Sequence, residues 1–152
     1  MILTQILQPS CIKAPLESKD KNQAIEELVN VLSDAGLLGD RAEALEAVMA
    51  REATRSTGIG SGIAIPHGKC GAVTELIMAI GIAREPIDFD SIDDKPVQII
   101  VLLISPPDQT GPHIQALARI SRLLLDAPFK AQLEKAGSPE EVFSLISGKE
   151  SE

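Results

Sequence analysis

Two segments of the chain are almost continuously apolar, and they predict the central strands of a β-sheet. Residues 76–83 and 97–105 are bounded by turn residues on both sides. Uninterrupted apolar runs are typical of strands that are covered on both faces. The link between them is rich in aspartate and proline, which predicts a loop. We therefore expect an α/β fold in which a mixed β-sheet is flanked by helices on both faces, with the strand order left open.

Two helices are predicted before these strands. Asp20 and Asp40 can each cap a helix, because a glutamine or glutamate stands three residues later at the capping-box position. The first helix should end near Gly36, and the second a little after Arg51. The apolar positions with helical spacing that we expect to be buried are Ile25, Leu28, Val29 and Leu32 in the first helix, and Leu45, Val48 and Met49 in the second.

Three more helices are predicted after the second apolar strand. The first is long: Pro112 suits its opening turn, and Thr110 or Gly111 could cap it. A shorter helix covers residues 129–135, and the last one opens at Ser138. The positions expected on the inner face of the long helix are Ile114, Leu117, Ala118, Ser121 and Leu124.

Length and charge favour one acidic domain. The 152 residues are 44% hydrophobic and contain no repeat, so we expect a single domain over residues 1–147 and a frayed tail at 148–152. The net charge of -8 disfavours binding of nucleic acid and is compatible with a basic partner protein. No apolar run is long enough to span a membrane, and no signal peptide is seen. Two cysteines are too few for a disulfide scaffold, so we expect a cytoplasmic protein.

A glycine-rich loop at residues 56–62 precedes an extended piece at 63–66. A Walker A loop and a dinucleotide fingerprint would both need glycine where this chain has Ile63. The Walker pattern also needs serine or threonine after Lys69, where Cys70 stands. We therefore expect no nucleotide cofactor. The glycines either give tight backbone geometry near a reacting group or form an ordinary flexible turn.

His67 lies where a partner could reach it. Pro66 restricts Ile65 to extended geometry, so His67 should sit at the end of a short strand, directly before Gly68. A neutral imidazole is an available nucleophile at cellular pH. From the residues alone, a nucleophilic and a structural histidine remain equally open.

Three further side chains are candidates for chemistry near His67. His113 is expected in the first turn of a helix, where backbone N–H groups attract anions, although it could instead be a surface histidine. Arg51 could grip phosphate oxygens with its guanidinium group or simply face the helix dipole. Cys70 could form a nucleophilic dyad, but a small buried side chain is favoured. The histidines lack zinc-ligand spacing, and the aspartates at 88–94 lack the EF-hand order.

Three segments resemble the enzyme IIA domains of the bacterial phosphoenolpyruvate-dependent phosphotransferase system, in its fructose/mannitol/nitrogen-regulatory class. The first is the Arg-Glu pair at 51–52 followed by STGIGSGIAIPHGK at 56–69, a form that looks most like the nitrogen-regulatory branch. The others are FDSIDDKPV at 89–97 and HIQALARI at 113–120. The resemblance extends over residues 3–147.

This resemblance implies the mannitol-type enzyme IIA fold and a phosphocarrier function. It implies that Nε2 of His67 accepts a phosphoryl group from the carrier protein HPr or its nitrogen-branch counterpart NPr, giving tele-phosphohistidine. His113 matches the histidine that stabilises this group, and Arg51 matches the arginine that contacts it. No metal or cofactor is implied.

The resemblance leaves the next step of the relay open. In a nitrogen-regulatory enzyme IIA, the phosphorylation state sets which protein is bound. In a fructose- or mannitol-type enzyme IIA, the phosphoryl group passes to a cysteine of an enzyme IIB for sugar uptake. A non-catalytic binding module is the third possibility. The chain departs from the family pattern at Ser61, where the nitrogen branch is expected to have asparagine, and at Asp94, where glycine is common.

Overall fold

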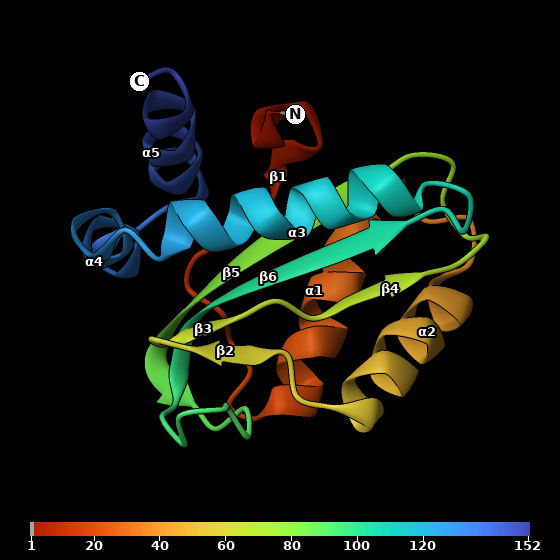
Figure 1. Ribbon diagram of the computed structural model, residues 1–152, viewed down its shortest axis with the longest axis horizontal. Coiled ribbons are helices and arrows are strands. Elements are labelled where there is room, and N and C mark those ends of the chain that lie inside the picture. Colours follow the sequence, from red (N-terminus) through yellow and green to blue (C-terminus); the bar gives the residue numbers. More distant parts are fainter. Residues whose placement is uncertain (1) are drawn as a thin grey trace.

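A computed structural model describes residues 2–152, which form a six-stranded mixed β-sheet (Figure 1). The sheet order is β1-β5-β6-β3-β2, and β4 follows β3 along the same edge of β6. β5 runs antiparallel to β6, whereas β3 and β4 run parallel to it. The strands are β1 (Leu7–Lys13), β2 (Gly58–Gly60), β3 (Ile63–Ala64), β4 (His67–Lys69), β5 (Ile77–Ile87) and β6 (Val97–Ser105).

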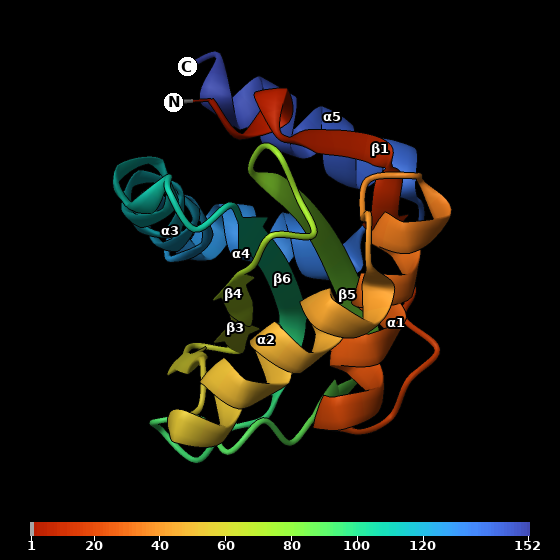
Figure 2. The ribbon, with the colours of Figure 1, turned by 90° about the vertical axis from the view of Figure 1, so that its right-hand side faces the viewer.

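Helices cover both faces of the sheet, which confirms the expected α/β class. Figure 2 shows α1 and α2 on one face and α3 and α4 on the other, with α5 beside β1. Within residues 2–152, no helix is long and apolar enough to cross a bilayer. The helices are η1 (Leu3–Gln5, a 3-10 turn), α1 (Lys21–Asp34), α2 (Arg41–Thr54), α3 (Thr110–Leu124), α4 (Ala127–Lys135) and α5 (Pro139–Glu150).

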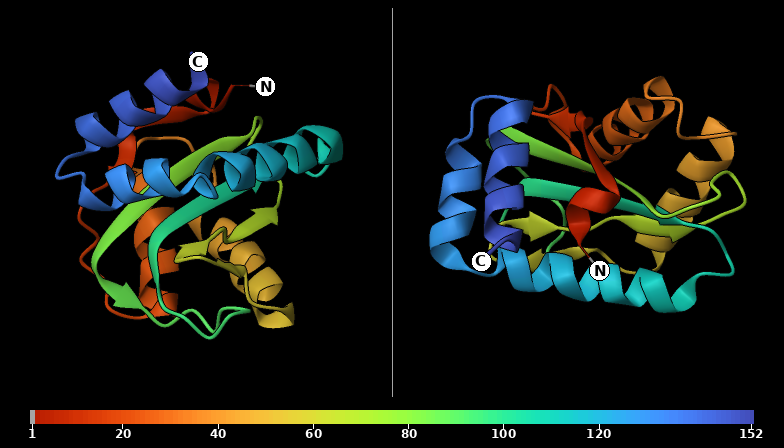
Figure 3. Two further views of the ribbon diagram at one scale, coloured as in Figure 1. Left: turned by 60° about the vertical axis from the view of Figure 1, so that its left-hand side comes forward. Right: turned by 90° about the horizontal axis from the view of Figure 1, so that it is seen from above.

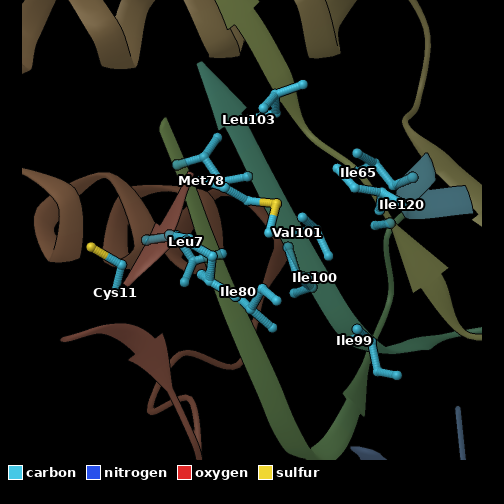
Figure 4. Close-up of a cluster of buried hydrophobic side chains, with 14 of the residues drawn as sticks. Leu7, Cys11, Ile65, Met78, Ile80, Ile99, Ile100, Val101, Leu103 and Ile120 are labelled. Atoms are coloured by element: carbon cyan, nitrogen blue, oxygen red, sulfur yellow. The ribbon is translucent and has the colours of Figure 1, made fainter. Parts of the chain in front are cut away.

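β5 and β6 form the centre of the core, as their apolar runs predict. Met78 of β5 lies opposite Leu103 of β6, and Ile80 lies opposite Val101. Figure 4 shows these side chains packed between the sheet and its helices. Each fully buried aliphatic side chain of this size contributes about 1.5–3 kcal/mol relative to an exposed one. The two strands therefore anchor the elements that carry the candidate site.

The first two helices begin at the expected caps, but the buried side of α2 differs. Asp20 accepts a hydrogen bond from the Gln23 amide at 2.8 Å, and Asp40 accepts one from the Glu43 amide at 3.0 Å. α1 buries the predicted residues. In α2 the buried positions are Ala44, Val48 and Glu52, whereas Leu45 and Met49 are only half-buried. The buried side of α2 is narrower than expected and is shifted around the helix, because α2 packs mainly on β4 and α1.

The face of α3 that packs inward only partly matches the expected one: Leu124 is buried as predicted, and Leu117 and Ser121 are half-buried. His113, Ala116, Ile120 and Leu124 are buried, whereas Ile114 is 60% exposed and Ala118 is exposed. The apolar pattern placed Ile114 inside, whereas in the structure the preceding residue, His113, takes the inward position. The expected caps also differ, because Thr110 and Gly111 lie inside the helix and Gln109 is its N-cap, without a side-chain hydrogen bond.

The chain end is helical where a frayed tail was expected. α5 continues through Glu150, into the range that was expected to be frayed. The Glu150 carboxylate accepts hydrogen bonds from the amides of Leu3 at 2.7 Å and Thr4 at 3.1 Å, and from Nε of Arg119 at 2.9 Å. This buried carboxylate joins the first turn of the chain, α3 and α5, which lie side by side in Figure 3.

The glycine-rich segment is a β-hairpin instead of a loop. β2 and β3 pair antiparallel, and the turn between them has positive φ at Ser61 (58°) and Gly62 (78°). Asp93 accepts a hydrogen bond from the Ser61 amide at 3.1 Å, and Asp94 also has a positive φ of 59°. Left-handed backbone favours asparagine and glycine. Ser61 and Asp94 thus adopt the backbone conformation that suits the asparagine and the glycine expected at these positions from the resemblance.

Candidate functional site

His67 is the first residue of β4, and not the last residue of a strand as expected. Ile65 and Pro66 separate β3 from β4, and His67 pairs with Leu103, near the end of β6. Its side chain is partly exposed at the surface of the sheet. The rigid core strand therefore fixes the position of a histidine that a partner can reach.

The hydrogen bond of the His67 ring determines which nitrogen is reactive. Nδ1 lies 2.7 Å from the carbonyl oxygen of Ile65. Because a carbonyl only accepts, Nδ1 must carry the proton in this contact. The neutral ring has one proton, so Nε2 holds the lone pair. His67 is thus held as the tautomer whose Nε2 is nucleophilic.

Burial keeps this ring neutral. It lowers the pKa of His67 below its ordinary value, and the positive charge of Arg51 lowers it further. The hydrogen bond to Ile65 and the negative charge of Glu52 act in the opposite direction. The downward influences prevail, so the imidazole is uncharged at neutral pH.

Two surface cavities meet at His67. One, of about 340 Å³, is lined by Thr57 and Ile92 among others, and the second, of about 410 Å³, contains His113. Arg51 lines both of them, as does His67 itself. The site is therefore open on two sides of the His67 ring, and the guanidinium group of Arg51 lies between the two cavities. Such a group suits the oxygens of a phosphate.

His113 faces His67 across the second cavity. The centroids of the two rings are 5.4 Å apart, and the ring planes are inclined by 60°. His113 is only 5% exposed, so it is not the surface histidine that the sequence left open. Its Nδ1 lies 2.6 Å from Oγ of Ser105, a buried residue that sequence reasoning missed.

Arg51 and Lys69 bring positive charge to the site from two different elements. Arg51 lies in the last turn of α2, and its Nη1 donates to the carbonyl of Arg55 at 2.9 Å. Lys69 ends β4, and its Nζ donates to Oγ1 of Thr110 at 3.1 Å. The structure thus brings together all three sequence-predicted site residues, His67, His113 and Arg51.

Gly68 allows α2 to approach β4. A Cβ atom at this position would lie 3.2 Å from the carbonyl carbon of Ala47 and 3.2 Å from the amide nitrogen of Val48. Both are backbone atoms of α2, so a larger residue would push the helix away. Because Arg51 is one turn further along α2, this close contact sets its distance to His67.

Glu52 is a second residue that sequence reasoning left unassigned. Its carboxylate is buried, lies 2.8 Å from Nζ of Lys21, and accepts hydrogen bonds from the amide and the hydroxyl of Thr57. The amide bond is 2.9 Å long. Through the ion pair and these hydrogen bonds, Glu52 joins α1 and α2 to Thr57, the residue directly before the hairpin. A sequence signal existed, because Ala44, Val48 and Glu52 follow each other at helical spacing on the buried side of α2.

Cys70 does not have the surroundings of a reactive thiol. It is buried, and burial raises the pKa of the thiol above its ordinary value. A buried thiol of this kind is mostly protonated at neutral pH. Within residues 2–152, no group of three or more His, Cys, Asp or Glu side chains is arranged to hold a metal ion.

The burial of His113 predicts a pH-dependent stability. Burial, with the charges of His67 and Lys69, lowers its pKa from 6.5 to about 4. The unfolded chain therefore binds this proton more tightly than the folded chain does. The contribution of His113 to the free energy of unfolding is fully present above the pKa of the unfolded chain. It decreases as the pH falls, by about 2 kcal/mol at about pH 5. Urea unfolding at neutral and acidic pH measures this loss.

The variant His113→Gln separates the contribution of His113 to the pH dependence from that of the Asp and Glu side chains, which also titrate in acid. It lacks the titrating ring, so its free energy of unfolding should decrease less than that of the wild type between about pH 7.5 and about pH 5. Equal decreases in the two proteins would contradict a buried neutral His113.

Comparisons with known proteins place this chain in a family. The family model described as "Phosphoenolpyruvate-dependent sugar phosphotransferase system, EIIA 2" matches residues 5–149. The chain is 37% identical over 147 residues to a fructose-specific EIIABC component of Bacillus subtilis, which covers 97% of this chain and 23% of that protein. It is also 37% identical over 127 residues to a fructose-specific EIIA component of Haloferax volcanii, covering 84% of this chain and 82% of the relative.

Relatives of the nitrogen-regulatory type match over the same region. A nitrogen regulatory protein of Bradyrhizobium diazoefficiens is 32% identical over 147 residues, covering 97% of this chain and 95% of the relative. The crystal structure of nitrogen regulatory protein IIA-Ntr from Neisseria meningitidis superimposes with a TM-score of 0.86 at 33% identity, over 95% and 98% of the two chains.

A solved complex of enzyme IIA for mannitol with phosphorylated enzyme IIB, from Escherichia coli, has the same fold. Its TM-score is 0.79 at 22% identity, over 93% of this chain and 99% of that one. This match shows the fold alone, and it confirms the expected mannitol-type architecture. By the match of the family model over nearly its whole length, the chain belongs to the EIIA 2 family of the phosphoenolpyruvate-dependent sugar phosphotransferase system.

Proposed function

We propose that this chain is a phosphocarrier that accepts a phosphoryl group on Nε2 of His67 from a phosphohistidine of HPr or NPr. One observation carries the proposal: the carbonyl of Ile65 engages Nδ1, which leaves the lone pair on Nε2 of a partly exposed ring. The cavities beside this ring are lined by Arg51, a phosphate-binding type of side chain. Since the family belongs to a phosphotransferase system, a nucleophilic nitrogen is the group that the site needs.

The transfer is one in-line displacement at phosphorus. The Nε2 lone pair of His67 forms the new N–P bond, while the N–P bond of the donor breaks and its electron pair returns to the donor imidazole. The transition state is loose, with negative charge on the three equatorial oxygens. Arg51 and Lys69 supply the opposing positive charge, and His113 stabilises the phosphoryl group after transfer. The donor supplies the phosphoryl group directly, so we propose no cofactor.

A reconstituted relay tests this function. The chain is incubated with phosphoenolpyruvate, enzyme I and HPr, and a second reaction omits HPr. We expect the intact mass to increase by one phosphoryl group only in the complete reaction. The adduct should be labile in acid and stable in alkali, and nitrogen NMR should place it on Nε2 of His67. A chain that binds HPr but never gains the phosphoryl group would instead be a non-catalytic binding module.

For the next step we propose a nitrogen-regulatory role in the cytoplasm, in which phosphorylation of His67 changes the protein that is bound. The active-site motif and the similarity to IIA-Ntr from Neisseria meningitidis support this role. A fructose-type role, with transfer to a cysteine of an enzyme IIB, is the second candidate because the fructose-specific relatives are 37% identical. Purified phosphorylated chain is mixed with a fructose-specific IIB domain. Rapid loss of its phosphoryl group would favour the transport role, and retention would favour the regulatory one.

A further inference from the structure

Ser105 is a buried serine directly behind His113. Its Oγ lies 2.6 Å from Nδ1 of His113, and the residue is 0% exposed. Ser105 ends β6, where it pairs with Lys69 of β4, and its carbonyl accepts the Cys70 amide at 3.0 Å. The sheet therefore holds the hydroxyl in place. By contrast, α3, which carries His113, begins without a side-chain cap.

The contact between Ser105 and His113 is compatible with two positions of the ring proton. A hydroxyl can donate to Nδ1, which leaves the proton of the neutral ring on Nε2, or it can accept from a protonated Nδ1. Burial, followed by the charges of His67 and Lys69, lowers the pKa of His113 to about 4. The ring is therefore neutral at neutral pH, and its single proton must be on one nitrogen or the other.

The neighbouring His67 distinguishes the two arrangements. With Nδ1 turned to Ser105, Nε2 is the nitrogen of His113 left for the cavity that it shares with His67. The two rings are only 5.4 Å apart, so a phosphoryl group on Nε2 of His67 would lie beside His113. Phosphoryl oxygens are anionic and only accept hydrogen bonds. A proton on Nε2 of His113 would stabilise them, and a lone pair there would repel them.

We infer that Ser105 is a positioning residue whose hydroxyl donates to Nδ1 of His113 and thereby keeps the ring proton on Nε2, directed at the phosphoryl group of His67. The inference rests on the proposed function of His67. It gives the two histidines opposite tautomers. His67 has its proton on Nδ1, held by a backbone carbonyl, and His113 has its proton on Nε2, held there by a side-chain hydroxyl.

Nitrogen NMR of the wild-type chain tests the tautomers without any mutation. The chain contains two histidines, so a sample with ¹⁵N-labelled histidine gives two ring systems, and His67→Asn assigns them. At neutral pH, long-range proton–nitrogen correlations should show a protonated Nε2 in His113. A proton on Nδ1 of His113 would overturn the inference. If the tautomer is as expected but His67 never takes up phosphate, the proposed function fails while the hydrogen bond from Ser105 stands.

Substitution of Ser105 tests its effect on transfer. In Ser105→Ala, we expect His113 to lose its preference for the Nε2 proton and the rate of transfer from HPr to fall about tenfold, the effect of one lost hydrogen bond. Ser105→Thr keeps a hydroxyl and should restore both. The matched control is Ser91→Ala, because Ser91 is 4% exposed and its Oγ has no partner within residues 2–152. The control should change neither the tautomer nor the rate.

The inference is overturned if Ser105→Ala keeps both the wild-type tautomer and the wild-type rate. It is also overturned if Ser91→Ala slows transfer as much as Ser105→Ala does, since any buried hydroxyl would then have the same effect. Should Ser105→Ala fail to fold, the wild-type tautomer of His113 still decides the question.

Discussion

Replacing His67 with alanine is expected to abolish uptake of phosphate from phospho-HPr. The variant loses the Nε2 lone pair that would form the N–P bond, and His113 cannot replace it. The His113 ring is 5% exposed, and its Nδ1 is engaged by Ser105. Transfer needs an in-line approach of the donor, which a buried ring does not allow. Incorporation of radioactive phosphate from phosphoenolpyruvate, in the presence of enzyme I and HPr, measures the loss.

The fold of this variant should be unaffected. His67 is partly exposed and lies at the start of a short strand, so truncation leaves no large cavity in the core. Circular dichroism and the unfolding midpoint in urea provide the control. If the folded His67→Ala protein is labelled to the same extent as the wild type, His67 is not the acceptor.

The sheet and the helix starts could be predicted because their signals are local. An apolar run is a property of adjacent residues, and it identified β6 with its observed bounds and β5 as far as Ala83, although β5 continues to Ile87, where a loop was expected. The caps at Asp20 and Asp40 likewise depend on a residue three positions away. His67 could also be nominated, since Pro66 holds the preceding Ile65 in extended geometry and Gly68 has no side chain that would block a partner.

The buried polar contacts could not be predicted, because they depend on partners that are distant in sequence. His113 occupies an inward position of α3 that an apolar residue would normally take, so the pattern favoured Ile114 instead. The hydroxyl that satisfies His113 comes from the end of β6, and its position follows from the pairing of β4 with β6. A pattern of hydrophobic residues contains no information about that pairing. The start of β4 at His67 depends on the same pairing with β6, so it could not be predicted either.

Glu52→Ala is expected to produce the largest loss of stability, about 3–5 kcal/mol in the free energy of unfolding. The side chain of Glu52 is 4% exposed and that of Lys21 is 18% exposed, so the pair is largely desolvated. Removing the carboxylate leaves the Lys21 ammonium with only the exposed Asp90 carboxylate, at 3.8 Å, and leaves the Thr57 amide without its acceptor. Urea unfolding followed by circular dichroism measures the change.

Two further variants separate the contribution of the Glu52 charge to stability from the contribution of its hydrogen bonds. Glu52→Gln keeps an acceptor for Thr57 and should lose less stability than Glu52→Ala. Combining Glu52→Ala with Lys21→Ala should destabilise by less than the sum of the two single changes, because neither partner then remains without the other's charge. Glu17→Ala is the matched control: its carboxylate is 81% exposed and 3.4 Å from Lys13, and such surface pairs contribute about 0–1 kcal/mol. A Glu52→Ala protein as stable as Glu17→Ala would contradict a desolvated pair.

This ion pair also connects the stability of the fold to the site. Glu52 and Arg51 are neighbours in α2, so their side chains point about 100° apart around the helix axis. When Glu52 is fixed in the core by Lys21 and Thr57, Arg51 is directed to the cavities beside His67. Glu52→Gln, where it remains folded, should therefore slow the uptake of phosphate at His67 as well as reduce stability. Unchanged uptake in that variant would show that Arg51 is positioned without Glu52.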